Sequence, residues 1–289
     1  MTDVFEWFDG KRRWQAPYDQ IGEGSPLLCL PAPSTISTRQ EMRGLAERLG
    51  DARAVVRIDW PGFGDTDRAP MRYRAPLYLG FLAAFVERFH EPVDVIAAGH
   101  AAGYALDVAR GAPGRFSHLA LLAPTWRGPL PTALGPRPRT WRALEALMLA
   151  PLVGPLLHAA NSSRPFIHWM MRRHVYAEPS HITEALLDAR VGTTHRANAR
   201  FAAAAFVTGG LDAFRSRDDF LEAARACQAP VLLAIGVRTP PKSLAEMQAL
   251  ATLSNVRTRT LPGSLAFYDE YPDETAAAVG DFLEMASSG

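Results

Sequence analysis

The chain has 289 residues, of which 48% are hydrophobic and 21% charged, and this suits one large α/β domain with an insertion. Its 31 basic and 30 acidic residues leave a net charge of +1, which provides no field to gather nucleic acid. No apolar run approaches the about 20 residues of a transmembrane helix, and the N-terminal stretch contains no apolar signal region. We therefore expect a cytoplasmic protein with no integral membrane segment, and the only cysteines, Cys29 and Cys227, are predicted to be reduced and buried.

The first part of the chain alternates predicted strands and helices. Asp9 and Gly10 predict a two-residue turn in an opening hairpin, because Asp-Gly readily supplies positive φ angles. Glycines 62 and 64 lie in a loop that we interpret as a tight connection rather than a nucleotide site, since a lone Gly-x-Gly is a weak signal. Apolar runs typical of buried strands occur at 26–30, 54–59 and 95–98, and helical periodicity occurs at 38–49 and 77–89.

Residues 95–103, Val-Ile-Ala-Ala-Gly-His-Ala-Ala-Gly, are the stretch around which the rest is organised. An apolar strand leads to Gly99, and Gly103 follows at the start of an alanine-rich helical segment. This pattern is typical of a sharp strand–turn–helix elbow. Its middle position is Ala101, and a methyl group cannot attack a carbonyl carbon.

The strand–helix alternation stops after the strand predicted at 118–123. Prolines at 129, 131, 136 and 138 interrupt it, and four helices are then predicted without a convincing strand, at 141–158, 166–175, 182–190 and 201–207. We interpret residues 127–221 as a helical cap, with core segments at 1–126 and 222–289. In the last segment, strands are predicted at 231–236 and 256–261, a helix opens with the capping box Ser243-x-x-Glu246, and a final helix covers 274–285.

In order and spacing, these elements resemble the α/β-hydrolase fold, a mostly parallel central sheet flanked by helices and carrying a helical cap insertion. The most specific pieces are the segments 28–33, 59–64 and 99–103, which resemble the family's oxyanion loop, its next strand-end loop and its nucleophile elbow. The resemblance implies a nucleophile, an acid, a histidine base and N–H donors for an oxyanion.

None of the positions that this resemblance implies carries the expected group. The nucleophile position is Ala101, and the acid position after the strand at 231–236 aligns with Thr239. The histidine position is Ala266 without a gap, or Tyr268 with a small insertion, and no histidine lies beyond His195. In the oxyanion loop the donor position is Pro33, which has no N–H.

We therefore expect a non-hydrolytic pseudo-hydrolase that needs no cofactor or metal and binds an apolar small molecule or a protein partner. Ordinary serine-hydrolase activity is not expected. Two alternatives stay open: a cofactor-independent lyase or isomerase that uses Tyr268 as acid or base, and an assembly subunit without enzymatic activity. The candidate pocket residues flank the elbow and the two loops beside it: Pro33, Ser34, His100, Ala101, Ala102, Trp126 and Tyr268.

Overall fold

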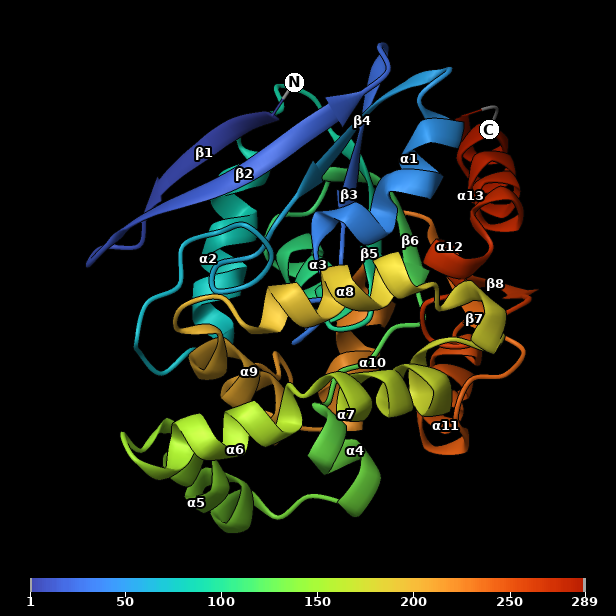
Figure 1. Cartoon of the computed structure of the whole chain (residues 1–289). Coiled ribbons are helices and arrows are strands. Elements are labelled where there is room, and N and C mark those ends of the chain that lie inside the picture. The colour runs from blue at the N-terminus through green and yellow to red at the C-terminus, as the bar shows by residue number, and fades with distance from the viewer. Residues whose placement is uncertain (1, 288–289) are drawn as a thin grey trace.

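A mostly parallel, eight-stranded sheet organises residues 2–287, which are the residues that this computed structural model describes (Figure 1). The strand order is β1-β2-β4-β3-β5-β6-β7-β8, and only the β1–β2 and β2–β4 pairs are antiparallel. The strands are β1 (Thr2–Phe8), β2 (Arg13–Ile21), β3 (Ser25–Leu30), β4 (Arg53–Ile58), β5 (Val93–Ala98), β6 (Phe116–Leu122), β7 (Val231–Gly236) and β8 (Val256–Leu261).

The sequence of each strand matches its place in the sheet. All six residues of β5 and all six of β7 are buried, because helices cover both faces of these inner strands. Strand β8 forms the edge of the sheet and exposes Arg257 and Arg259 between buried ends. Continuous apolar runs therefore mark the centre of the sheet, and the predicted α/β-hydrolase fold is confirmed.

Two layers of helices enclose the sheet. On one face α1 packs against α13, and on the other α2 and α10 pack against α3, with α11 beside α10. The helices of these layers are η1 (Arg39–Met42), α1 (Arg43–Leu49), α2 (Ala75–Val86), α3 (Ala101–Gly111), α10 (Arg217–Ala226), α11 (Pro241–Ala251), α12 (Phe267–Glu270) and α13 (Pro272–Ser287). No single helix among residues 2–287 is long and apolar enough to cross a bilayer.

The segment between β6 and α10 is helical: its helices α4, α5 and α6 lie at the end of the molecule far from the β1–β2 hairpin, whereas α8 lies across the middle (Figure 1). Its elements are α4 (Pro129–Leu134), α5 (Pro138–Leu149), α6 (Val153–Asn161), α7 (Arg164–Met170), η2 (Met171–Val175), η3 (Pro179–His181), α8 (Glu184–Thr194) and α9 (Ala199–Thr208). Below we call this segment, residues 129–208, the helical insertion. The cap boundary predicted at residue 221 lies inside α10, which packs on the core helices α3 and α11.

Three local predictions are wrong. The hairpin turn spans residues 9–12 instead of two residues, because the Asp9 carboxylate accepts hydrogen bonds from the Lys11 and Arg12 backbone N–H groups. The helix predicted at 141–158 is broken after Leu149, next to Pro151, which cannot continue the hydrogen-bonding pattern. Helix α11 begins at Pro241 rather than at a Ser243 cap, and the Glu246 carboxylate bonds to side chains outside that helix.

Candidate active site

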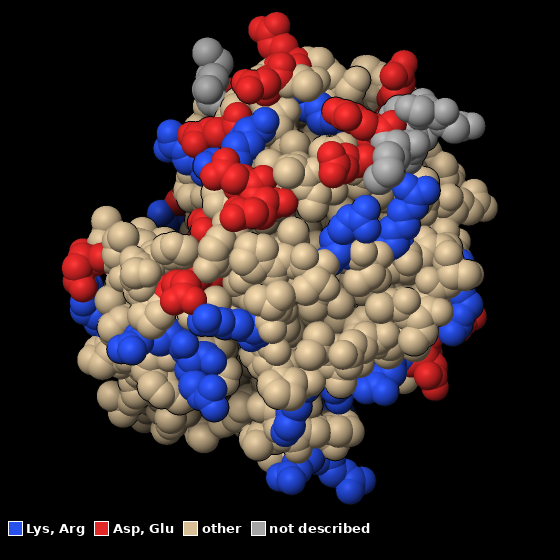
Figure 2. Space-filling view, turned by 90° about the vertical axis from the view of Figure 1, so that its right-hand side faces the viewer, with Lys and Arg blue, Asp and Glu red and all other residues tan. Residues whose placement is uncertain are grey.

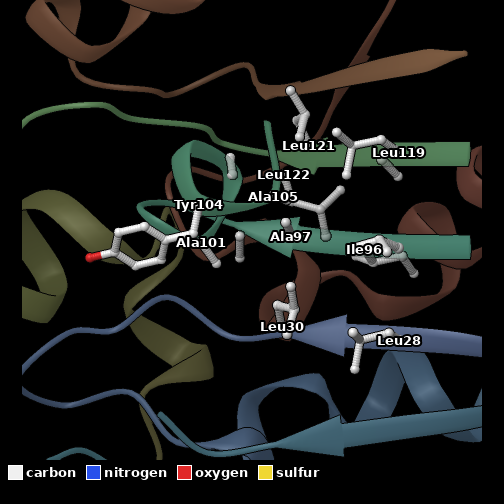
Figure 3. Close-up of a cluster of buried hydrophobic side chains, with 14 of the residues drawn as sticks. Leu28, Leu30, Ile96, Ala97, Ala101, Tyr104, Ala105, Leu119, Leu121 and Leu122 are labelled. Atoms are coloured by element: carbon white, nitrogen blue, oxygen red, sulfur yellow. The ribbon is translucent and has the colours of Figure 1, made fainter. Parts of the chain in front are cut away.

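The predicted elbow is present where β5 meets α3. Gly99 makes the turn with a φ of +52°, and a Cβ atom there would lie 3.0 Å from the Cβ of Ala32. Helix α3 begins at Ala101, which is fully buried among apolar side chains such as Leu30 and Ala97 (Figure 3). In this family the elbow is a strained turn that exposes its nucleophile, whereas here the glycine alone carries the positive φ.

The other predicted pocket residues form separate contacts and do not converge on Ala101. The Nε2 atom of His100 lies 3.3 Å from an Asp212 carboxylate oxygen, and both groups are largely buried. The indole N–H of Trp126 donates to Glu246 on α11 at 2.9 Å. Two further candidates form hydrogen bonds only with near neighbours in the chain: the Ser34 hydroxyl bonds to the Ser37 hydroxyl, and the Ala102 N–H donates to the Gly99 carbonyl. Pro33 has no N–H to donate.

The two positions aligned with the family's acid and histidine are both buried. The Thr239 hydroxyl has no hydrogen-bond partner among the described residues. The Ala266 N–H donates to the Val175 carbonyl at 3.0 Å, and its side chain joins an apolar cluster with Ile36 and Ile167. Tyr268, two residues further along the same loop, is the one that reaches a carboxylate.

That carboxylate belongs to Glu41 on η1, a residue that the sequence analysis did not single out. One Glu41 oxygen accepts the Tyr268 hydroxyl at 3.1 Å and the Ala32 backbone N–H at 3.2 Å. Its other oxygen lies 3.5 Å from Nη1 of Arg190. The Glu41 carboxylate therefore connects two loops. It bonds to the oxyanion loop through Ala32 and to the loop after β8, where the family has its histidine, through Tyr268.

Arg190 links Glu41 to a second carboxylate. Its Nη2 atom donates to Asp269 at 2.6 Å and to the Tyr176 hydroxyl at 3.2 Å, and Tyr176 donates to the same Asp269 oxygen at 2.5 Å. The Nε atom of Arg190 is buried without a hydrogen-bond partner among the described residues, so one donor of the guanidinium is free. We call these five residues, Glu41, Tyr176, Arg190, Tyr268 and Asp269, the Glu41 cluster.

Burial raises the pKa of Glu41 and of Tyr268 in the Glu41 cluster. Desolvation raises the pKa of Glu41 to about 7, which outweighs the opposing attraction of Arg190. Burial also raises the pKa of Tyr268 well above its usual value of 10.0, so its hydroxyl stays protonated and can donate. Glu41 thus has a proton affinity suited to general acid–base chemistry near neutral pH.

A pocket of about 440 Å³ opens beside this cluster, between η1 and α8. Arg190 and Asp269 belong to its wall, together with Arg196, Asp65, Thr38 and Gln40. Its volume lies in the range of small-molecule sites. Because Arg190 contacts both the pocket and Glu41, a substrate in the pocket would lie one side chain away from the Glu41 carboxyl.

The sequence contained a signal for two of the cluster residues that it did not lead to, Glu41 and Arg190. In the predicted helix 38–49, Glu41 precedes Leu45 by four residues and so shares its buried face. Arg190 likewise follows the buried Leu187 by three residues in α8. A charged residue on the apolar face of a helix is a candidate site residue. No group of three or more metal-binding side chains occurs among the residues that the structure describes.

The sheet, the elbow and the helical insertion define a hydrolase-like α/β protein. The family model of the alpha/beta hydrolase family matches residues 27–278, so the chain belongs to that family. No curated protein matches the chain.

Solved structures with the same fold cover nearly all of the chain. A thermophilic esterase from Thermogutta terrifontis is 16% identical with a TM-score of 0.77, and the match covers 99% of each chain. Cfl2 from Burkholderia cenocepacia is 22% identical with a TM-score of 0.75, over 97% of this chain and 95% of that one. A deformylase from Pseudomonas putida S16 is 20% identical with a TM-score of 0.67, over 96% of this chain and all of the other.

These comparisons correct the expected function. We expected a non-hydrolytic binding protein, with a lyase or isomerase and an assembly subunit as alternatives. That expectation is wrong, because the chain belongs to a hydrolase family and the structures similar to it include an esterase and a deformylase. Alanine in place of serine at position 101 is therefore not sufficient to conclude that the protein lacks enzymatic activity.

Proposed function

We propose that this chain is a hydrolase of small esters or amides in which Glu41, and not a serine–histidine pair, supplies the acid–base chemistry. The observation that carries the proposal is the buried Glu41 carboxyl, whose pKa of about 7 leaves it partly ionised at neutral pH. In this reaction the ionised Glu41 accepts a proton from a water molecule while the water oxygen attacks the substrate carbonyl carbon. The tetrahedral intermediate then collapses: the bond from the carbonyl carbon to the leaving oxygen or nitrogen breaks, and the protonated Glu41 returns its proton to the departing alcohol or amine, which leaves a carboxylic acid. Water thus takes the place of the covalent serine nucleophile.

Arg190 provides the charge that such a reaction needs. As the water attacks, negative charge develops on the carbonyl oxygen, and a fixed cation stabilises it strongly in a site that excludes bulk water. Arg190 has a free Nε donor and lines the pocket at the point where it meets the Glu41 cluster. Tyr268 holds the Glu41 carboxyl in place through its hydroxyl. Because Arg190 lies on α8, we propose that a shift of α8 admits substrate and water.

The same proposal includes three finer points. The triad positions Ala101, Thr239 and Ala266 take no part in the chemistry, which is consistent with their apolar or unpartnered side chains. Residues 127–221 act as a cap that supplies Arg190 and Tyr176 to the site. The protein is cytoplasmic, and this is supported by Cys29 and Cys227, which are both free and buried.

The pH dependence of ester hydrolysis tests the role of Glu41. We expect kcat/KM for short p-nitrophenyl esters to rise with pH through about 7, because the ionised carboxyl is the active form. Glu41→Gln should lower kcat/KM by about 100-fold or more and remove the inflection, which is the range expected for loss of a general base.

Glu246→Gln is the matched control, since Glu246 is also a buried carboxyl but pairs with Arg127 and Arg217 on another side of the core. It should keep both the rate and the inflection. Thermal unfolding of each variant identifies any that fails to fold. The proposal is refuted if the wild-type protein turns over no ester or amide in the panel, or if folded Glu41→Gln keeps the wild-type rate.

A further inference from the structure

Exposed apolar side chains concentrate on one part of the helical insertion. Eleven large hydrophobic residues are exposed among the described residues, and eight of them lie between positions 134 and 169. Single exposed hydrophobic residues are ordinary on protein surfaces, whereas a concentration of this kind marks an interaction surface. The five that surround the α5–α6 junction, which we call the apolar tip, are Leu147, Leu152, Val153, Leu156 and Leu157.

The apolar tip has the shape of a wedge. Helices α5 and α6 meet at about 100° across a break of three residues, and Leu152 in that break is 85% exposed. By length and composition the two helices together are apolar enough to span a bilayer, but the bend separates them into two short arms. Such a pair can insert its corner among lipid headgroups and the upper acyl chains without crossing the membrane.

The charges in the stretch of chain that contains the apolar tip are almost all positive. Residues 129–175 contain six arginines and no lysine or aspartate, and their single glutamate, Glu145, is buried against Arg74. The rest of the chain carries four more acids than bases, so the excess of basic residues belongs to this segment. Figure 2 looks onto the side of the molecule away from the α5–α6 junction, and there basic side chains predominate over the lower part, with acidic side chains gathered in the upper part.

Five of these arginines are free to meet a ligand. They are exposed and form no salt bridge with a described residue: Arg137, Arg139, Arg142, Arg172 and Arg173. Two exposed aromatic residues precede Arg172 and Arg173 in the chain: Phe166 and Trp169 lie on α7 with their ring centroids 5.7 Å apart. A surface segment that combines exposed aromatic rings, arginines and apolar side chains has the composition expected at a membrane interface.

We propose that the apolar tip docks the protein on an anionic lipid bilayer. The arginines would meet lipid phosphates and carboxylates while Leu152 and Leu156 enter the acyl region. The charge pattern favours a lipid surface over a second copy of this chain. A two-fold interface over this segment would face the same unpaired arginines of both copies toward one another, which is repulsive, whereas an anionic bilayer complements them.

Sedimentation of the full chain with lipid vesicles tests the docking. We expect the wild-type protein to pellet with phosphatidylcholine vesicles that contain about a third phosphatidylserine, less with phosphatidylcholine alone, and less at high salt. The double variant Leu152→Glu with Leu156→Glu should lose at least about tenfold in partitioning, because it places carboxylates at the inserted corner. Replacing Arg172 and Arg173 by Gln should weaken binding only to the anionic vesicles.

The matched control is the pair Val4→Glu and Val237→Glu, which are similarly exposed but lie outside the insertion. These variants should bind vesicles as the wild type does. Failure of the wild-type protein to pellet with anionic vesicles overturns the proposal, as does an equal loss in the control pair. If the wild-type protein binds no vesicles but is a dimer, and the double tip variant is a monomer, the apolar tip is an interface with a second copy of the chain instead.

Discussion

At the scale of single residues, Glu41 links the candidate chemistry to stability. Its pKa in the folded protein is about 7, above the ordinary value of 4.5, so the folded state holds an extra proton between these values. The free energy of unfolding must therefore fall as pH rises through that window, by an amount on the order of 3 kcal/mol. Below pH 4.5 the carboxyl is protonated in both states and this dependence disappears.

We predict that Glu41→Gln removes this loss of stability. Gln is neutral and has nearly the same shape, so the free energy of unfolding of the variant, relative to wild type, should increase from about pH 5 to about pH 8. Urea unfolding at intervals across this range measures the difference. Parallel curves for the two proteins would mean that Glu41 titrates normally, and its role as a base would then lose its physical basis.

Sequence alone led to only part of this site. It led to Tyr268, and also to the elbow and Ala101, which lie outside the Glu41 cluster, because glycine spacing and loop order follow from local geometry. It did not lead to Glu41, whose role depends on Tyr268 and Arg190, residues 227 and 149 positions away. A carboxylate on a helix is ordinary in a sequence, and only tertiary burial gives it an unusual pKa.

At the scale of elements, the loop after β4 is held by a buried carboxylate. Asp59 accepts the Arg39 backbone N–H at 2.6 Å, the Arg39 guanidinium at 2.5 Å and the Asp65 N–H at 3.0 Å. Gly64 passes over this carboxylate with a φ of +52°, and a Cβ there would lie 2.0 Å from Asp59 Oδ1. This close approach agrees with the interpretation of the Gly-x-Gly loop as a tight connection.

Gly64→Ala should therefore destabilise the protein by about 3 kcal/mol or more, because it displaces a buried, paired carboxylate. Gly114→Ala is the control. Gly114 also has a positive φ, +81°, but nothing lies within 4 Å of its Cβ position, so only the backbone strain of about 1 to 2 kcal/mol is added. Urea unfolding measures the free energy of unfolding of both variants. Equal decreases in Gly64→Ala and Gly114→Ala would show that the close approach of Gly64 to Asp59 is unimportant for stability.

Helices and strands whose ends are set by neighbouring residues in the sequence were predicted more accurately than those whose ends depend on contacts with distant residues. The central strands lie within one or two residues of their predicted ranges, because a continuous apolar run is stable mainly when it is buried at the centre of a sheet. Helix α11 was misjudged because Glu246, which has the right spacing for a capping box, pairs with Trp126 and Arg217. A local signal was thus overridden by partners far away in the sequence.

At the scale of the whole molecule, the helical insertion contacts the core through apolar packing and several polar pairs. Arg74, just before α2, forms a bidentate pair with Glu145 of α5, at 2.5 and 2.8 Å. The Glu145 side chain is only 3% exposed, whereas that of Arg74 is 40% exposed. Removing the arginine would therefore leave a carboxylate unpaired in the interface between insertion and core, which is costly.

We expect Arg74→Met to loosen the insertion without unfolding the sheet. Limited proteolysis should then cut more rapidly within residues 127–221, while hydrogen exchange in the strands is unchanged, because the sheet does not depend on this pair. Adding Glu145→Gln should restore much of the protection by removing the unpaired charge. Arg43→Met, which breaks only the exposed Arg43–Glu47 pair, should have no effect. If Arg74→Met instead raises exchange evenly through strands and insertion, then the two parts unfold together and residues 127–221 are no separate unit.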